Sequence, residues 1–303
     1  MEVLYWLESI RNPVLDTIMQ YLTYLGDELL FMLLALAVFW CVDKREGYYL
    51  LFVGFFGTIV NQFLKLWYRI PRPWVKDPNF TIVEAAREGA GGYSFPSGHT
   101  QSATGNFGCL ARWHTHWGFR ALCIALLAVT AFSRMYLGVH TPLDVGVSLA
   151  IGLILVFAFY PVMKKAAEQP KMMYVLLGGM LALSFAFVLY ANLTEFPADA
   201  GMENVLEGRK NSYSLFGALL GFMISYPIER KHIVFSEKAP LWGQACKLIL
   251  GLVGLLAVKE GLKVLFGLCG LDWMWLHAVR YCAVVLFAAL VWPLTFPYWS
   301  KKR

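Results

Sequence analysis

The chain has 303 residues, of which 58% are hydrophobic and 15% are charged. A soluble globular domain carries about 25% charged residues, so this composition excludes an ordinary soluble protein. The net charge of +6 could suggest nucleic-acid binding, but no basic stripe or nucleic-acid-binding module is visible, so no nucleic-acid partner is expected. The six cysteines have neither metal-site nor redox spacing, and we expect them to be small buried hydrophobes.

Residues 1–24 differ from the rest of the chain. Apolar residues from Val3 to Ile10 recur at helical spacing with charged residues between them. This pattern predicts an amphipathic helix that lies in the membrane interface, and a full membrane span is the alternative. The first residues lack a basic start and a small-residue cleavage site, so no cleaved signal is expected there.

The remaining sequence is dominated by apolar runs. A bilayer core of about 30 Å requires roughly 20 apolar residues per helix. The candidate spans lie at about residues 25–42, 48–66, 99–111 (short), 121–139, 143–162, 173–191, 213–228, 243–266 and 275–295. The predicted fold is therefore all-α, a polytopic integral membrane helical bundle. We expect an interfacial helix at 1–24, a core at 25–162 and a further transmembrane region at 173–303.

The distribution of Lys and Arg predicts how these spans are oriented, because cytoplasmic loops are enriched in both residues. One set of connections, which includes Lys44-Arg45 and the tail Lys301-Lys302-Arg303, holds 14 basic residues. The opposite set holds six when the cations of the motifs below are set aside. We expect the richer set to be cytoplasmic, so the motifs fall at the outer or periplasmic face of a plasma or inner membrane.

The first polar motif follows the span at 48–66. Lys65 ends that span, and Arg72 lies between Pro71 and Pro73. Both cations could be snorkelling anchors at the membrane surface. The two prolines favour a different role, because they fix the backbone around a guanidinium that can bind two phosphate oxygens at once.

The second motif is Pro96-Ser97-Gly98-His99, which precedes a helical run. Proline and glycine predict a tight turn, and the backbone N–H groups at a helix start bind anions. His99 at that end could protonate a leaving oxygen. The alternative is a capping serine followed by a histidine without a role.

The third motif is Ser133-Arg134 followed by His140 and Asp144. Residues four apart share one face of a helix, so the spacing predicts that Asp144 and His140 meet on a single helix. The carboxylate would bind the protonated ring nitrogen and leave the other nitrogen free to attack. A capping pair at a helix start is the alternative.

Together, the motifs resemble the three signatures of the type-2 phosphatidic acid phosphatase superfamily, K-x6-R-P, P-S-G-H and S-R-x5-H-x3-D, over roughly residues 20–162. The resemblance implies a six-helix core and metal-independent hydrolysis of a membrane lipid phosphate. The substrate would be a phosphomonoester such as a sphingosine-1-phosphate-like, phosphatidate-like or polyprenyl phosphate lipid. His140 would form a phosphohistidine, Asp144 would orient it, and His99 would protonate the leaving alkoxide. The implied phosphate-binding residues are Lys65, Arg72, Ser97, Gly98 and Arg134. No acidic cluster indicates a metal site, and no cofactor is expected.

The carboxyl-terminal region, 173–303, resembles the sphingosine-1-phosphate phosphatases in layout. It carries charged residues in or beside apolar runs, namely Glu229-Arg230, Lys259-Glu260, Lys263 and Arg280. Charge inside a membrane suggests function, and mutual pairing, cytoplasmic anchoring or interfacial placement is the alternative. A lipid phosphotransferase with an alcohol acceptor and a membrane transporter of phosphorylated lipid are the competing functions, although a transporter would not require the His–Asp pair with three cations. The particular lipid and the oligomeric state stay open.

Overall fold

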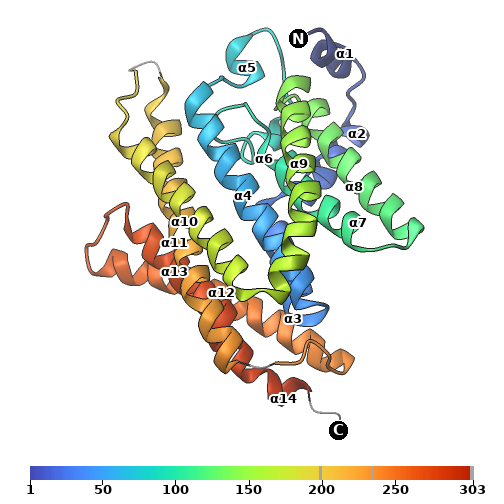
Figure 1. The fold of residues 1–303 in the computed structure, drawn as a ribbon. Helices are drawn as coiled ribbons and strands as arrows, with labels where there is room; N and C mark the ends of the chain where they lie inside the picture. The colour runs from blue at the N-terminus through green and yellow to red at the C-terminus, as the bar shows by residue number, and fades with distance from the viewer. Residues whose placement is uncertain (198–199, 234, 301–303) are drawn as a thin grey trace. The chain divides into compact units, whose positions relative to one another are not determined.

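The fold is all-helical, as the sequence predicts (Figure 1). The structure is a computed structural model that describes residues 1–197, 200–233 and 235–300, and these residues contain no strand. Five helical segments are long and apolar enough to cross a membrane, or six if a bent pair forms one span. They are Lys44–Lys76, Trp117–Tyr136, Pro142–Glu168, Pro170–Leu193 and Leu276–Ser300, and the bent pair is Pro13–Gly26 with Glu28–Cys41.

Three of the expected spans are not among these segments. The expected span at 99–111 belongs to α6 (Gly98–Ala103), the π-helical turn η3 (Thr104–Gly108) and α7 (Cys109–Trp113). Together they are shorter than the roughly 20 residues that a span requires. The other two lie within α11 (Met202–His232) and α12 (Leu241–Leu268). The tail Lys301-Lys302-Arg303, counted in the orientation prediction, lies outside the described residues.

The chain divides into two compact units. Unit 1 consists of Met1–Leu34, Tyr49–Val162 and Phe196–Gly208. Unit 2 consists of Ala35–Tyr48, Met163–Glu195 and the chain from Arg209 onward. Every residue of the three motifs belongs to unit 1. The domain boundaries given from sequence stay a prediction.

The amino-terminal segment of unit 1 forms two helices where one was expected. These are α1 (Glu2–Ser9) and α2 (Pro13–Thr23). The break lies at Asn12, whose side chain accepts a hydrogen bond from the Leu15 amide at 3.1 Å. Asn12 thus caps α2, and proline at the first helical position strengthens the new start. The interfacial placement of residues 1–24 stays a prediction.

The α1 helix is anchored by burial. Leu4 and Leu7 are 0% and 1% exposed and belong to a hydrophobic cluster with Phe80 and Val139. Val139 directly precedes His140 in the chain. Helix α1 therefore packs against the loop that carries part of the third motif.

Three further helices complete the surroundings of the motifs in unit 1. They are α4 (Lys44–Tyr68), α8 (Trp117–Tyr136) and α9 (Pro142–Glu168). Helix α6 packs against α8 and against η1 (Tyr24–Gly26), the short 3-10 turn that follows α2. Ends of these helices, together with the loops between them, carry the polar residues of the site.

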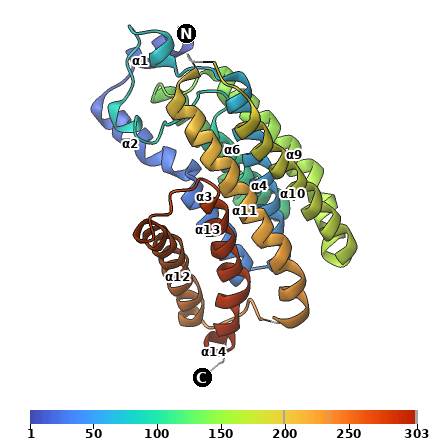
Figure 2. The same cartoon turned by 90° about the vertical axis from the view of Figure 1, so that its left-hand side faces the viewer.

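Unit 2 contains the carboxyl-terminal helices. Helix α12 packs against α13 (Leu276–Leu286), as Figure 2 shows, and α10 (Pro170–Leu193) precedes α11 in the chain.

Charged residues that drew attention in the sequence are paired in this unit. Glu229 is 2% exposed, forms an ion pair with Lys44, and accepts a hydrogen bond from the Tyr48 hydroxyl at 2.9 Å. Lys259 Nζ lies 3.5 Å from Glu260 Oε1. Lys259 and Glu260 thus pair with each other, whereas Glu229 pairs with Lys44, which was not among the charged residues named from sequence in the carboxyl-terminal region.

Candidate active site

The first motif is held at the end of α4. Arg69 follows the last helical residue with φ at 51°, in the left-handed region that commonly ends a helix. Lys65, one turn earlier, is 9% exposed and donates a hydrogen bond to the carbonyl oxygen of Tyr93. The chain then turns through Arg72, which precedes α5 (Pro73–Lys76). Proline at the start of α5 fixes the backbone next to this arginine, as expected.

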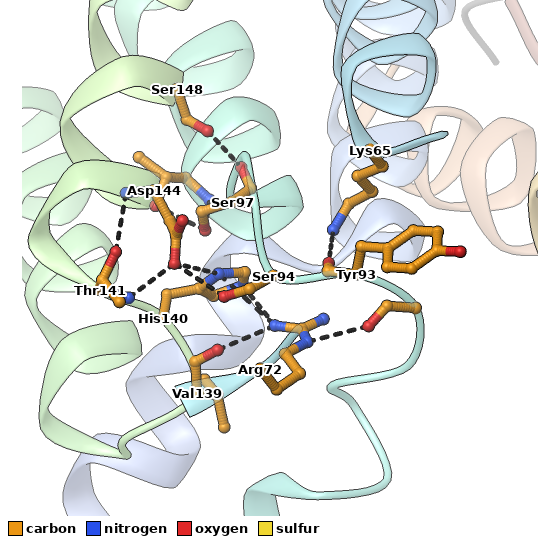
Figure 3. Close-up of polar contacts among 12 residues, drawn as sticks. Lys65, Arg72, Tyr93, Ser94, Ser97, Val139, His140, Thr141, Asp144 and Ser148 are labelled. Carbon is orange, nitrogen blue, oxygen red and sulfur yellow. Dashed lines mark hydrogen bonds and ion pairs between the residues drawn. The ribbon is translucent and has the colours of Figure 1, made fainter. Parts of the chain in front are cut away.

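The Arg72 guanidinium is surrounded by acceptors (Figure 3). Its Nε and NH2 atoms donate to the carbonyl oxygens of Gly92 and Gly91, at 3.1 and 2.6 Å. Its NH1 atom donates to the Val139 carbonyl at 2.9 Å and lies 2.9 Å from Nε2 of His140. Arg72 is 6% exposed. The first and third motifs therefore meet at one guanidinium whose position is fixed by backbone carbonyls.

The pairing of His140 with Asp144 was predicted, but its structural basis is different. His140 does not belong to α9, which begins at Pro142, so the two residues do not share a helix face. Asp144 Oδ2 instead accepts the Thr141 amide at 2.7 Å, while the Asp144 amide donates to Thr141 Oγ1 at 3.2 Å. This reciprocal arrangement is a capping box. It turns the carboxylate back toward the residue before the helix, and Nδ1 of His140 lies 3.7 Å from Oδ2.

The two ring nitrogens of His140 have different surroundings. Arg72 NH1 lies 2.9 Å from Nε2 and 3.5 Å from Nδ1, while Nδ1 faces the Asp144 carboxylate. A guanidinium only donates and a carboxylate only accepts, so these neighbours favour the tautomer with the proton on Nδ1. Burial, followed by the positive charge of Arg72, holds the pKa of His140 well below its ordinary value of 6.5. His140 is 1% exposed.

A serine that the sequence analysis did not single out also binds this carboxylate. Ser94 is fully buried and donates from Oγ to Asp144 Oδ2 at 2.7 Å (Figure 3). Oδ2 thus accepts from the Ser94 hydroxyl and the Thr141 amide, and faces His140. These contacts fix the position of the carboxylate beside Nδ1 of His140.

The second motif is hydrogen-bonded to α9 (Figure 3). Ser97 is the N-cap of α6 and is fully buried. Its amide donates to the Asp144 carbonyl at 3.2 Å, and its carbonyl accepts from the Ser148 hydroxyl at 2.8 Å. Its hydroxyl oxygen accepts from the Thr100 hydroxyl at 3.0 Å and from the Thr100 amide at 3.4 Å. The Ser97 hydroxyl proton has no acceptor in the described part of the chain, which suits a phosphoryl oxygen.

Arg134 contributes unused donors. It lies near the end of α8 and is 1% exposed. Its NH1 atom donates to Thr23 Oγ1 at 2.7 Å, and its carbonyl accepts from the His140 amide at 3.3 Å. Its Nε and NH2 atoms are buried without a hydrogen-bond partner among the described residues. Leaving buried charged donors unpaired is costly, so their presence favours an anion as the missing partner.

Exposure differs across the predicted site. His140 is almost fully buried, whereas Gly98 and His99 are partly exposed. The proposed attacking group thus lies deeper than the proposed acid, as expected if the leaving group departs outward. In the described part of the chain, no group of three or more His, Cys, Asp or Glu side chains could hold a metal ion.

Comparison with known proteins agrees with this geometry. Residues 46–168 match the model of the PAP2 superfamily. Residues 213–299 match a second model, described as the transmembrane extension of a PAP2 superfamily phosphatase. The chain is also 32% identical over 154 residues to undecaprenyl-diphosphatase BcrC of Bacillus subtilis (strain 168), which covers 50% of this chain and 77% of that protein. The chain belongs to the PAP2 superfamily.

Two further relatives each match about half of the chain. A probable sphingosine-1-phosphate phosphatase of Dictyostelium discoideum is 30% identical over 167 residues, 50% of this chain and 39% of that protein. Phosphatidylglycerophosphatase B of Bacillus subtilis (strain 168) is 29% identical over 163 residues, 49% of this chain and 75% of that protein. No solved structure matches the chain. The family and these relatives identify the protein as a lipid phosphatase, integral to a membrane.

Proposed function

We propose that this PAP2 protein hydrolyses the phosphomonoester of a membrane lipid through a phosphohistidine intermediate on His140. The observation that supports the proposal most is the arrangement around that ring. Nε2 lies 2.9 Å from Arg72 NH1, and Nδ1 faces Asp144, which favours the tautomer with Nε2 unprotonated. A buried imidazole in this tautomer can act as a nucleophile, and the guanidinium beside it is suited to bind phosphoryl oxygens.

The proposed reaction has two steps. Nε2 of His140 attacks phosphorus, the bond from phosphorus to the ester oxygen breaks, and His99 donates a proton to the departing alkoxide. The Nδ1 proton stays between His140 and Asp144. Water then attacks the phosphohistidine, His99 takes a proton from it, and inorganic phosphate leaves with His140 restored.

Positive charge supports the phosphoryl group during both steps. Lys65, Arg72 and Arg134 are all at least nine-tenths buried, where charge stabilisation is stronger than in water. Arg72 transfers its NH1 hydrogen bond from Nε2 to a phosphoryl oxygen as attack begins. The Ser97 hydroxyl and the unused Arg134 donors supply further hydrogen bonds. Phosphoryl transfer depends mainly on positioning and charge stabilisation, which this set provides without requiring a metal.

Apolar surface beside the site supports a lipid substrate. Trp67 and Tyr68 follow Lys65 on α4 and are 53% and 54% exposed, and Leu143 beside Asp144 is 64% exposed. A hydrocarbon chain bound there would position the phosphate through contacts remote from the reaction. The names of the relatives support sphingoid, glycerolipid and polyprenyl substrates. The active site is proposed to face the outer or periplasmic side, on the count of basic residues.

The decisive experiment follows phosphate on detergent-purified protein. Substrates labelled in the phosphate are mixed with enzyme in excess chelator, and the reaction is quenched in alkali, which preserves phosphohistidine. We expect labelled protein and released phosphate from the wild type, and neither from His140→Ala. The exposed His232→Ala variant is the matched control and should behave as wild type. Near-normal turnover by His140→Ala would reject the proposed nucleophile.

The same assay identifies the substrate and the acceptor. Each buried methylene contributes up to about 0.8 kcal/mol, so long-chain lipid phosphates should exceed short-chain esters in kcat/KM by orders of magnitude. Equal kcat/KM for glycerol phosphate and a long-chain lipid phosphate would argue against a lipid substrate. Added alcohol that captures the label, with little free phosphate, would instead establish a phosphotransferase.

A further inference from the structure

The bend between α2 and α3 (Glu28–Cys41) touches two residues of the active site. The segment Pro13–Gly26, which ends in the turn η1 (Tyr24–Gly26), is bent by 49° from Glu28–Cys41. Helix α6, which carries His99, packs against η1. Nothing in the three motifs includes residues of this bend.

Thr23, the last residue of α2, holds the Arg134 side chain. Its Oγ1 accepts from Arg134 NH1 at 2.7 Å, and it is 2% exposed. The Arg134 guanidinium is planar, so fixing NH1 also fixes the directions of Nε and NH2. These are the two atoms without a partner among the described residues. The threonine hydroxyl therefore sets the direction in which Arg134 presents its remaining donors.

Gly26, three residues later, lies against the backbone of His99. A Cβ atom built on Gly26 would lie 2.5 Å from the His99 carbonyl oxygen and 2.8 Å from Thr130 Cγ2. Neither separation is possible for a real side chain, so a larger residue would displace the start of α6. The absence of a side chain at Gly26 thus sets the position of His99.

We infer that Thr23 and Gly26 are positioning residues of the phosphatase, Thr23 for phosphate binding through Arg134 and Gly26 for proton donation through His99. The inference rests on the proposed function, because it uses the roles given there to Arg134 and His99. It assigns part of the catalytic apparatus to a segment for which sequence indicated only membrane attachment.

The Thr23 half is tested with Thr23→Val, which keeps the side-chain shape and removes the acceptor. A hydrogen bond to a charged group is strong enough that kcat/KM should fall about 10-fold or more, and vanadate, a mimic of pentacoordinate phosphorus, should bind more weakly by a similar factor. Thr23→Ser should restore both values. Thr17→Val is the matched control, because Thr17 only bonds to Pro13 of its own helix. Unchanged vanadate affinity in Thr23→Val would overturn this half.

The Gly26 half is tested with two substrates that share one hydrocarbon chain, an alkyl phosphate and an aryl phosphate. The alkoxide needs protonation as it leaves, whereas the aryl oxide needs little. Gly26→Ala should therefore lower kcat/KM for the alkyl ester at least about 10-fold more than for the aryl ester, since general acid catalysis contributes about 10²–10⁴-fold. The ratio of the two substrates does not depend on how much of the variant folds. Equal losses on both substrates would overturn the assignment.

His140→Ala separates failure of this inference from failure of the proposed function. If that variant is inactive while Thr23→Val and Gly26→Ala behave as wild type, only the positioning roles are wrong. If His140→Ala is active, the proposed mechanism is wrong, and the positioning roles fall with it.

Discussion

At the scale of single residues, one carboxylate oxygen collects the contacts beside the proposed nucleophile. Asp144 Oδ2 accepts from the Ser94 hydroxyl and the Thr141 amide, both at 2.7 Å, and lies 3.7 Å from Nδ1 of His140. The more its negative charge is shared with other donors, the less it favours protonation of the imidazole. The hydroxyl of Ser94 therefore helps to keep His140 unprotonated.

We expect Ser94→Ala to move the acid limb of kcat/KM toward higher pH. Without this donor, Asp144 stabilises the imidazolium more strongly, which raises the depressed pKa of His140. Neutral His140 is then available only at higher pH, and the acid limb of kcat/KM reports this group in the free enzyme. The measurement is a pH–rate profile. Ser225→Ala, which removes another buried serine hydroxyl bonded within its own helix, should leave the limb in place. A downward shift in Ser94→Ala would contradict the argument.

At the scale of helices and turns, much of the site could be predicted from sequence, but its local structure could not. The spacing from His140 to Asp144 correctly indicated a pair, and the pair forms through a turn outside the helix. Thr141-Pro142-Leu143-Asp144 contains the signal for that turn, since it is a capping-box pattern with proline at the first helical position. This signal would have placed the helix start at Pro142.

Other residues of the site carry no such signal. Thr23 reaches Arg134 across 111 positions of the chain, and only the packing of α2 on α8 brings them together. Ser94 is one serine among many in the sequence, and its position beside the second motif does not specify a carboxylate partner. Contacts of this kind depend on tertiary structure, so periodicity and spacing cannot predict them.

We expect Thr141→Val to reduce activity more than stability. Loss of a helix N-cap typically costs about 1 kcal/mol, but here it also removes one of the hydrogen bonds that hold Asp144 in the position proposed to orient His140. At a temperature where the variant stays folded, kcat should fall at least about 10-fold, which is more than the change in thermal midpoint accounts for. A tenfold loss corresponds to about 1.4 kcal/mol. Thr141→Ser should recover kcat. His116→Ala removes the cap at the opposite end of α8 from Arg134, and it should affect stability without a comparable loss of kcat. Parallel losses in the two variants would show that the cap has no special role.

At the scale of the whole molecule, the five or six candidate spans agree with a polytopic protein, and they do not specify which face carries the site. That question depends on the basic residues, most of which lie in connections predicted to be cytoplasmic. Loop residues such as Asn79 follow the first motif directly and are exposed. These loop residues therefore lie on the same side of the membrane as Arg72.

A cysteine introduced as Asn79→Cys, in a variant without the six native cysteines, tests this orientation. We expect an impermeant thiol reagent to label it in intact cells, because the positive-inside tendency places this loop outside. The same cysteine-free protein without the substitution provides the background. Labelling that requires permeabilised cells would place the active site on the cytoplasmic face.

The contact between Arg72 NH1 and His140 Nε2 also has a consequence, within the proposed mechanism, for which bonds the enzyme would leave intact. A neutral electrophile, such as the carbonyl carbon of an acyl ester, would have to displace the guanidinium from Nε2 and offers it no anionic oxygen in return. A phosphate would replace the lost contact with a stronger one. A glycerolipid phosphate carries both kinds of ester in one molecule. With His140 as the nucleophile, we therefore expect chemoselectivity between the two esters to arise at the attacking atom itself, so that the acyl chains survive removal of the phosphate.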